Sequence, residues 1–125
     1  MSTWDDAPVE LSDPISEFWP ANEWDNAAAI AELESGWNAF AENDTTTDEH
    51  GCGDVIGVRD GVTITAERSI GFFQINSCNL PAGWHWEHLF NAKHNAGTAH
   101  KLWDDAGQSW RPWYFSAVKL GLIKP

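Results

Sequence analysis

Two short stretches, ESGWN at residues 34–38 and SIGFFQIN at residues 69–76, decide how this chain of 125 residues is interpreted. The first stretch closes a run of apolar residues with helical spacing, and the second has the alternation of a strand. A helix of about 23–35 and a strand of about 71–76 would place Glu34, an acid at a helix end, opposite a polar strand face.

The first helix is predicted from apolar side chains that recur at helical intervals between Trp24 and Trp37. Asn22 is the expected N-cap because its side-chain oxygen can accept a hydrogen bond from a backbone amide of the first turn. Gly36 is the expected C-cap because glycine adopts the left-handed conformation without steric cost. These signals give the helix both of its ends.

The segment before this helix, residues 1–21, is expected to be an irregular N-terminal strap. Prolines interrupt it at positions 8, 14 and 20, and proline breaks regular structure. Its apolar group, Ile15, Phe18 and Trp19, should dock on the core. Residues 22–125 then form the main body of one domain, since a chain of this length supports a single modest core.

A β-hairpin is expected over residues 55–65, where two apolar runs flank the two-residue turn Asp60-Gly61. The polar segment before it, residues 41–53, is expected to be a turn-rich loop. The short strand of about 71–76 should pair with the hairpin.

Two further helices complete the expected fold. Apolar periodicity runs from Leu89 to a stop near Gly107, and a last helix should open at Pro112 and run to Gly121. The predicted fold class is α+β, mainly α, with a small antiparallel region of two or three strands beside the first helix.

Charge is distributed very unevenly along the chain. The net charge is −12; residues 1–58 hold 14 acids and no lysine or arginine, and residues 59–125 hold five acids and all seven bases. Such a negative field repels nucleic-acid phosphates and anionic lipids, which disfavours both as partners. The chain has no apolar run of 18 residues and no basic-then-apolar start, so we expect neither a membrane span nor an export peptide.

The two cysteines, Cys52 and Cys78, flank the expected β region and allow one disulfide. A metal site formed by these cysteines, His50 and either His85 or His88 is the alternative. We set it aside because zinc ligands normally occur as closely spaced pairs. No metal or other cofactor is therefore expected.

Glu34 would lie in the last turn of its helix, beside the negative end of the helix dipole. No cation is near it in the sequence, and tryptophans are available to cover it. Both conditions disfavour the carboxylate, so we expect a carboxyl group that stays protonated near neutral pH and can act as a general acid. The alternative is a solvated glutamate on a helix end.

Strand alternation would place Gln74 and Asn76 on one face and Phe73 and Ile75 on the other. Amide side chains carry donors and acceptors, which suits the hydroxyl and N-acetyl groups of sugars. Gly71 is expected to let a ligand approach the backbone closely. The alternative is an ordinary half-buried strand end.

The two stretches together resemble the lysozyme superfamily, which includes c-type lysozymes, phage muramidases and soluble lytic transglycosylases. The similarity continues into NAGTA at residues 95–99 and WRPW at residues 110–113, so that it covers about residues 22–118. It implies a lysozyme-like fold with an active-site cleft and a catalytic core over residues 22–125. It also implies cleavage of the MurNAc-GlcNAc β-1,4 bond of peptidoglycan.

The resemblance implies a role for particular residues. Glu34 would protonate the glycosidic oxygen, Gln74 and Asn76 would hold N-acetyl sugars, and Trp110 would pack against the acid. Trp84 or Trp86 could stack on sugar rings from the loop that follows the strand, although with nine tryptophans some must fill the core.

One position departs from the family pattern. The c-type lysozymes have an aspartate two residues before the glycine of the strand motif, where this chain has Ser69, which stays a candidate for substrate binding. The candidates for a second carboxylate are Glu67, Asp54 and Asp60. A retaining enzyme needs it at about 5–5.5 Å from the acid and an inverting one at about 6.5–9.5 Å. Lytic transglycosylases need only one glutamate, so the pattern favours a transglycosylase-like or inverting site.

The expected partners are peptidoglycan glycan strands, and we expect a monomer that acts on the bacterial cell wall. Because the chain is acidic and shows no signal peptide, delivery within a phage particle or by another route is the favoured origin. Two alternatives belong to other classes. One is a weakly active or inactive glycan-binding relative of lysozyme, and the other is an interaction protein whose acids imitate a polyanion.

Overall fold

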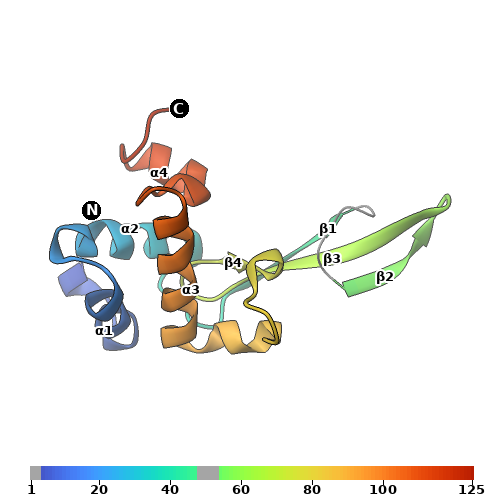
Figure 1. The fold of residues 1–125 in the computed structure, drawn as a ribbon, viewed down its shortest axis with the longest axis horizontal. Helices are drawn as coiled ribbons and strands as arrows, with labels where there is room; N and C mark the ends of the chain where they lie inside the picture. Colours follow the sequence, from blue (N-terminus) through green and yellow to red (C-terminus); the bar gives the residue numbers. More distant parts are fainter. Residues whose placement is uncertain (1–3, 48–53) are drawn as a thin grey trace.

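The computed structural model describes residues 4–47 and 54–125 (Figure 1). The fold is α+β: the helices gather at one end, and the antiparallel sheet extends from them as an arm (Figure 1). The α-helices of the described part are α1 (Val9–Phe18), α2 (Trp24–Ser35), α3 (Ala92–Asp105) and α4 (Tyr114–Lys119). None of its helices combines the length and apolar composition that crossing a bilayer requires.

The N-terminal segment contains helix α1, so the expectation of an irregular strap is wrong for these residues. Pro8 stands before the first helical residue, where proline is tolerated, and Pro14 lies inside the helix. Ile15 and Trp19 are 0% and 3% exposed, and Phe18 is half-buried against the same core. The predicted docking is therefore confirmed, and burial of this apolar face offsets the backbone hydrogen bond lost at Pro14.

Helix α2 confirms the predicted helix to within one residue at its start. Gly36 closes it with φ 63°, and its amide donates to the carbonyl of Glu32 at 2.8 Å. The predicted N-cap is wrong, because Asn22 lies in a preceding 3-10 turn and Glu23 takes the cap position without a side-chain hydrogen bond. Its middle is enclosed by other elements, with Ala27, Ala28, Ala29, Ile30 and Ala31 all buried.

The sheet has the order β1-β3-β2, with β4 paired to the end of β3, and every pairing is antiparallel. Its strands are β1 (Glu42–Thr47), β2 (Asp54–Arg59), β3 (Val62–Ile70) and β4 (Ile75–Asn76). The hairpin prediction is confirmed, because Asp60 and Gly61 form the turn with φ 51° and 81°. Strand β1 lies where a loop was expected, and the predicted strand of about 71–76 is reduced to β4.

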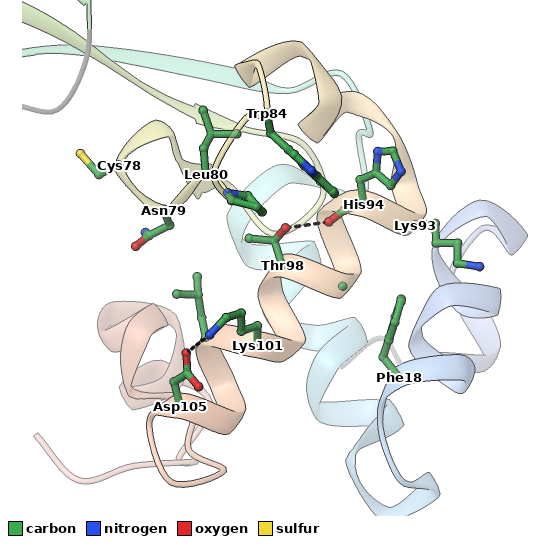
Figure 2. Close-up of a pocket in the computed structure, with 13 residues that line it drawn as sticks. Phe18, Cys78, Asn79, Leu80, Trp84, Lys93, His94, Thr98, Lys101 and Asp105 are labelled. Carbon is green, nitrogen blue, oxygen red and sulfur yellow. Dashed lines mark hydrogen bonds and ion pairs between the residues drawn. The ribbon is translucent and has the colours of Figure 1, made fainter.

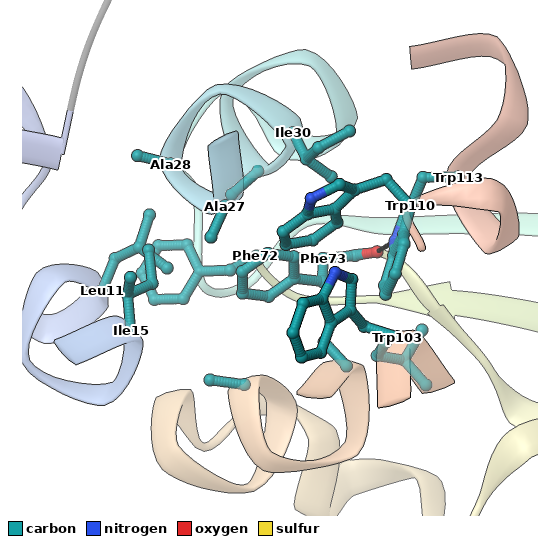
Figure 3. Close-up of a cluster of buried hydrophobic side chains, with 14 of the residues drawn as sticks. Leu11, Ile15, Ala27, Ala28, Ile30, Phe72, Phe73, Trp103, Trp110 and Trp113 are labelled. Carbon is teal, nitrogen blue, oxygen red and sulfur yellow. Dashed lines mark hydrogen bonds between the residues drawn. The ribbon is translucent and has the colours of Figure 1, made fainter. Parts of the chain in front are cut away.

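The core joins the helices to the turn that precedes β4 (Figure 3). Leu11 and Ile15 of α1 and the alanines of α2 surround Phe72 and Phe73, which are 2% and 0% exposed. Tryptophans at positions 19, 103, 110 and 113 close the other side, with the ring centroids of contacting tryptophans 5.5–6.4 Å apart. Four of the nine tryptophans therefore fill the core.

Asn95 of α3 fixes the turn before β4. It is 1% exposed, its Oδ1 accepts from the Phe73 amide at 3.0 Å, and its Nδ2 donates to the carbonyls of Ile70 at 2.7 Å and Leu89 at 2.9 Å. Gly71 has φ 77°, and a Cβ there would lie 2.3 Å from Asn95 Nδ2. Gly71 therefore admits the Asn95 side chain, which corrects the expectation that it makes room for a ligand.

Candidate functional site

Glu34 lines a cleft of about 330 Å³ where the end of α2 faces β4 and the segment after it. Two other parts of the chain, α3 and the 3-10 turn Arg111–Trp113, complete the walls. The lining residues are Glu34, Gln74, Ile75, Asn76, Asn79, Leu102, Pro112 and Trp113. The structure thus brings together Glu34, Gln74 and Asn76, and Glu34 is the only ionisable side chain among these lining residues.

Ser116 holds the Glu34 carboxylate. Its Oγ donates to Glu34 Oε2 at 2.5 Å, and Ser116 itself is 8% exposed on α4. Among the described residues no other donor contacts the carboxylate, so Oε1 is left to accept from a bound molecule. The sequence interpretation missed Ser116, because 82 positions separate it from Glu34 and no local pattern marks it.

The indole that lines the cleft with Glu34 belongs to Trp113, and its Nε1 donates to the carbonyl of Phe73 at 2.8 Å. Trp110 was expected to pack against the acid, but it does not line the cleft. It is 4% exposed, stacks on Trp19, and donates its Nε1 to Glu23 Oε2 at 2.7 Å. A buried indole N–H needs a partner, and the half-buried Glu23 supplies it.

Gln74 borders the cleft but is held by the protein itself. Its φ is 50°, its Oε1 accepts from Asn43 Nδ2 at 2.6 Å, and its Nε2 donates to the carbonyls of Ala41 at 3.2 Å and Gly71 at 3.0 Å. Both amide hydrogens are therefore engaged. Gln74 ties the residues around the start of β1 to the turn before β4 and shapes the wall of the cleft.

Asn76 keeps part of its hydrogen-bonding capacity. Its Oδ1 accepts from the amide of Cys78 at 2.8 Å, and its Nδ2 donates to Glu67 Oε1 at 3.1 Å. One amide hydrogen remains for a ligand. Asn79, which the sequence interpretation also missed, is an exposed carboxamide that lines the same cleft.

Two of the candidates for a second carboxylate, Glu67 and Asp60, are not among the described residues that line this cleft. Glu67 is half-buried on β3 and orients Asn76, as its hydrogen bond shows. Asp54 opens β2 opposite Ala66, and Asp60 is exposed in the turn at the far end of the arm (Figure 1). Ser69 is half-buried on β3, where its Cα pairs with that of Asn76.

Trp84 borders a second, larger cavity of about 570 Å³ rather than the Glu34 cleft (Figure 2). Trp86 is also outside the cleft: the guanidinium carbon of Arg68 lies 4.3 Å from its ring centroid. Cys78 is in a disulfide, and Cys52, the other cysteine of the sequence, lies outside the described residues. Within the described ranges no three His, Cys, Asp or Glu side chains cluster as metal ligands.

Comparison of the chain with protein-family models, with curated proteins and with solved structures finds no match in any of the three. The function proposed for the protein therefore depends on its cleft: a single carboxylate, bordered by carboxamides and an indole, at the junction of the helices and the sheet.

Proposed function

We propose that this protein is a lysozyme-like glycosidase that cleaves the β-1,4 bond between MurNAc and GlcNAc in peptidoglycan. The observation that carries the proposal is the lining of the Glu34 cleft. Among the described residues that line it, Glu34 is the only ionisable side chain, and it is accompanied by three carboxamides and the indole of Trp113. An acid beside carboxamides that keep hydrogen-bonding capacity, as Asn76 and Asn79 do, suits glycosidic cleavage.

In the proposed reaction, Glu34 donates its proton to the glycosidic oxygen as the bond from that oxygen to C1 of MurNAc breaks. GlcNAc leaves with its 4-hydroxyl restored, and Glu34 is left as a carboxylate. The Ser116 hydroxyl, 2.5 Å from Oε2, keeps the carboxyl group in one orientation so that Oε1 faces the substrate. Ser116 is a positioning residue, because it acts through Glu34.

No second carboxylate is found among the described residues that line the cleft, and this favours transglycosylation over hydrolysis. In this variant the 6-hydroxyl of the same MurNAc attacks its own C1 and gives its proton to Glu34. The products are a 1,6-anhydro end and a free GlcNAc 4-hydroxyl, with no water consumed. A retaining hydrolase would need a second carboxylate about 5–5.5 Å from the acid, and Glu67, which lies outside the lining, does not supply one.

The experiment is digestion of purified cell walls by wild type and Glu34→Gln, followed by mass analysis of the released fragments. We expect turbidity loss and anhydro ends with wild type, and neither with Glu34→Gln. Glu32→Gln, a half-buried glutamate on the same helix, is the matched control and should remain active. Fragments with reducing ends instead of anhydro ends would mean that the enzyme hydrolyses the bond. The proposal of a glycosidase would then stand, and that of transglycosylation would not.

A second candidate is a glycan-binding relative without turnover, and one observation favours it. Both amide hydrogens of Gln74 and one of Asn76 are already in hydrogen bonds within the protein, which leaves few donors to orient a substrate. The same digestion separates the two candidates. If wild type and Glu34→Gln are equally inert and both sediment with the walls, the protein binds glycan and does not cleave it.

A further inference from the structure

The cavity of about 570 Å³ is a groove along one face of α3 (Figure 2). Successive turns of the helix line it at positions 93 and 94, 97 and 98, 101 and 102, and 105. The segment from Cys78 to Trp84 forms the facing wall, and Phe18 of α1 approaches Gly97 from another side. Phe18 Cζ would be 3.2 Å from a Cβ at position 97, so glycine lets the Phe18 ring pack closely against α3 there.

This groove and the Glu34 cleft share two lining residues, Asn79 and Leu102. The two spaces are therefore neighbours, and both are bordered by these two side chains.

The chemistry of the groove differs from that of the cleft. Its walls are mainly apolar, with Phe18, Leu80, Pro81, Trp84 and Leu102. Two of the seven bases of the chain, Lys93 and Lys101, also line it, in a protein whose net charge is −12. The groove is thus one of the places where this acidic protein offers positive charge beside apolar surface.

Both lysines have intramolecular partners that a ligand can replace. Lys93 Nζ lies 3.2 Å from Glu17 Oε1, and Lys101 Nζ lies 2.6 Å from Asp105 Oδ2, which also borders the groove. The side chains of both pairs are 49–72% exposed. Exposed pairs of this kind contribute little to stability, so exchanging one carboxylate for another costs little. Lys101 Nζ donates a hydrogen bond to Asp105, and this bond raises the pKa of Lys101, which therefore stays charged.

We propose that this groove binds the stem peptide of peptidoglycan, the short peptide of small residues and free carboxylates that branches from the lactyl group of MurNAc. The inference rests on the proposed function, because it takes the glycan to lie in the Glu34 cleft. Apolar walls match the methyl groups of the stem, and the two lysines match its carboxylates.

The dimensions agree with this occupant. Lys93 and Lys101 are eight residues apart on α3, which corresponds to about 12 Å along a helix. Four residues of extended peptide span about 13 Å. A stem of four residues that leaves the cleft at Leu102 would therefore bring carboxylates within reach of both ammonium groups.

The test compares cleavage of two substrates: glycan strands that carry stem peptides, and the same strands after an amidase has removed them. We expect the double variant Lys93→Gln/Lys101→Gln to raise KM about tenfold on stem-bearing strands and to leave stripped strands unchanged. Lys119→Gln/Lys124→Gln removes the same charge outside both cavities and is the matched control, with unchanged KM on both substrates.

Three outcomes overturn the inference. Equal KM values for wild type and the groove variant on stem-bearing strands mean that the groove does not contact the stem. An equal rise on both substrates means that the groove holds glycan instead. An equal rise with the control variant means that only net charge matters. In each of these cases the proposed glycosidase stands.

If wild type cleaves neither substrate, the proposed function is refuted but the inference about the groove is not. A second measurement then tests the groove by itself. A synthetic stem tetrapeptide is titrated into isotope-labelled protein and followed by NMR. We expect saturable shifts of the amides of α3 and of the segment from Cys78 to Trp84, and their loss in Lys93→Gln/Lys101→Gln. The absence of saturable shifts in wild type would contradict the inference.

Discussion

At the scale of single residues, the site depends on one hydrogen bond between distant parts of the chain. Ser116 Oγ donates to Glu34 Oε2, so α4 fixes the orientation of a side chain that α2 carries. Ser116 is nearly buried, and Glu34 is half-buried. The acid is therefore held at the wall of the cleft instead of turning freely in water.

Ser116→Ala should lower kcat about tenfold with KM changed less than about twofold, because a misoriented acid affects the transition state more than binding. Ser35→Ala is the matched control, since Ser35 neighbours Glu34 but donates to the carbonyl of Ala31 at 2.9 Å. Steady-state cleavage of soluble glycan strands measures both constants. Equal kcat values for Ser116→Ala and wild type would show that the hydrogen bond has no catalytic role.

Substitutions at Gly71 and Gly61 distinguish the cost of backbone strain from the cost of a steric clash. Both have left-handed backbones, with φ 77° and 81°, but a Cβ at Gly71 meets Asn95 Nδ2 at 2.3 Å and one at Gly61 meets nothing within 4 Å. Gly61→Ala should lower the free energy of unfolding by about 1 kcal/mol, and Gly71→Ala by about 3 kcal/mol, since overpacking adds to the strain.

Chemical denaturation of the two glycine variants measures this difference directly. Similar losses of stability in both would mean that the turn before β4 shifts easily, and that Asn95 does not fix it.

At the scale of elements, α3 places the turn that borders the cleft. The buried carboxamide of Asn95 makes hydrogen bonds to Phe73, Ile70 and Leu89, all through their backbones. These bonds connect α3 to the end of β3 and to the residues just before Gln74. The geometry of β4, and with it the position of Asn76, depends on this one side chain.

Asn95→Ala should therefore lower the free energy of unfolding by about 3–5 kcal/mol, because it leaves buried backbone groups without partners at about 1–3 kcal/mol each. Asn91→Ala is the comparison. Asn91 is the N-cap of the same helix, and its side chain accepts a hydrogen bond from the amide of His94. Its removal should lower the free energy of unfolding by about 1 kcal/mol. Urea titrations of both variants make the measurement, and a loss below about 1 kcal/mol for Asn95→Ala would contradict the role of Asn95.

The elements that the sequence predicted well are those with a clear apolar period. The period and Gly36 give α2, and the pair Asp60-Gly61 gives the hairpin. Helix α1 was not predicted, because prolines at both ends and inside it indicate irregular structure. Its apolar face, which packs on α3 and α2, stabilises the helix despite Pro14. Strand β1 was missed because it is made of polar residues and is defined by its backbone pairing with β3.

At the scale of the whole molecule, the proposed function requires a protein with a net charge of −12 to approach an anionic cell wall. Salt shortens the range of this repulsion from about 30 Å at 0.01 M to about 8 Å at 0.15 M. The initial rate of wall digestion should therefore rise severalfold over this range, opposite to the trend for a basic protein. The thermal midpoint over the same range is the control for stability, and a rate that falls with salt would contradict the electrostatic account.

The site was predictable only where its residues are close in sequence or belong to a motif. Glu34, Gln74 and Asn76 came from two motifs, and the structure places them around one cleft. Trp113 and Asn79 were not identified, because their place depends on how α3 and the turn after it pack. The resemblance predicted that Trp110 packs against Glu34. Its buried indole instead donates a hydrogen bond to Glu23.

The central claim is that Glu34 is the one carboxylic acid that acts on the glycan. Its most direct test is the initial rate of fragment release from purified peptidoglycan by wild type, Glu34→Gln and Glu67→Gln. Glutamine at position 67 can still accept the hydrogen bond from Asn76, so only the acid is removed. We predict a loss of about 1000-fold for Glu34→Gln and less than about threefold for Glu67→Gln. A Glu34→Gln protein that digests peptidoglycan at the wild-type rate would contradict the account.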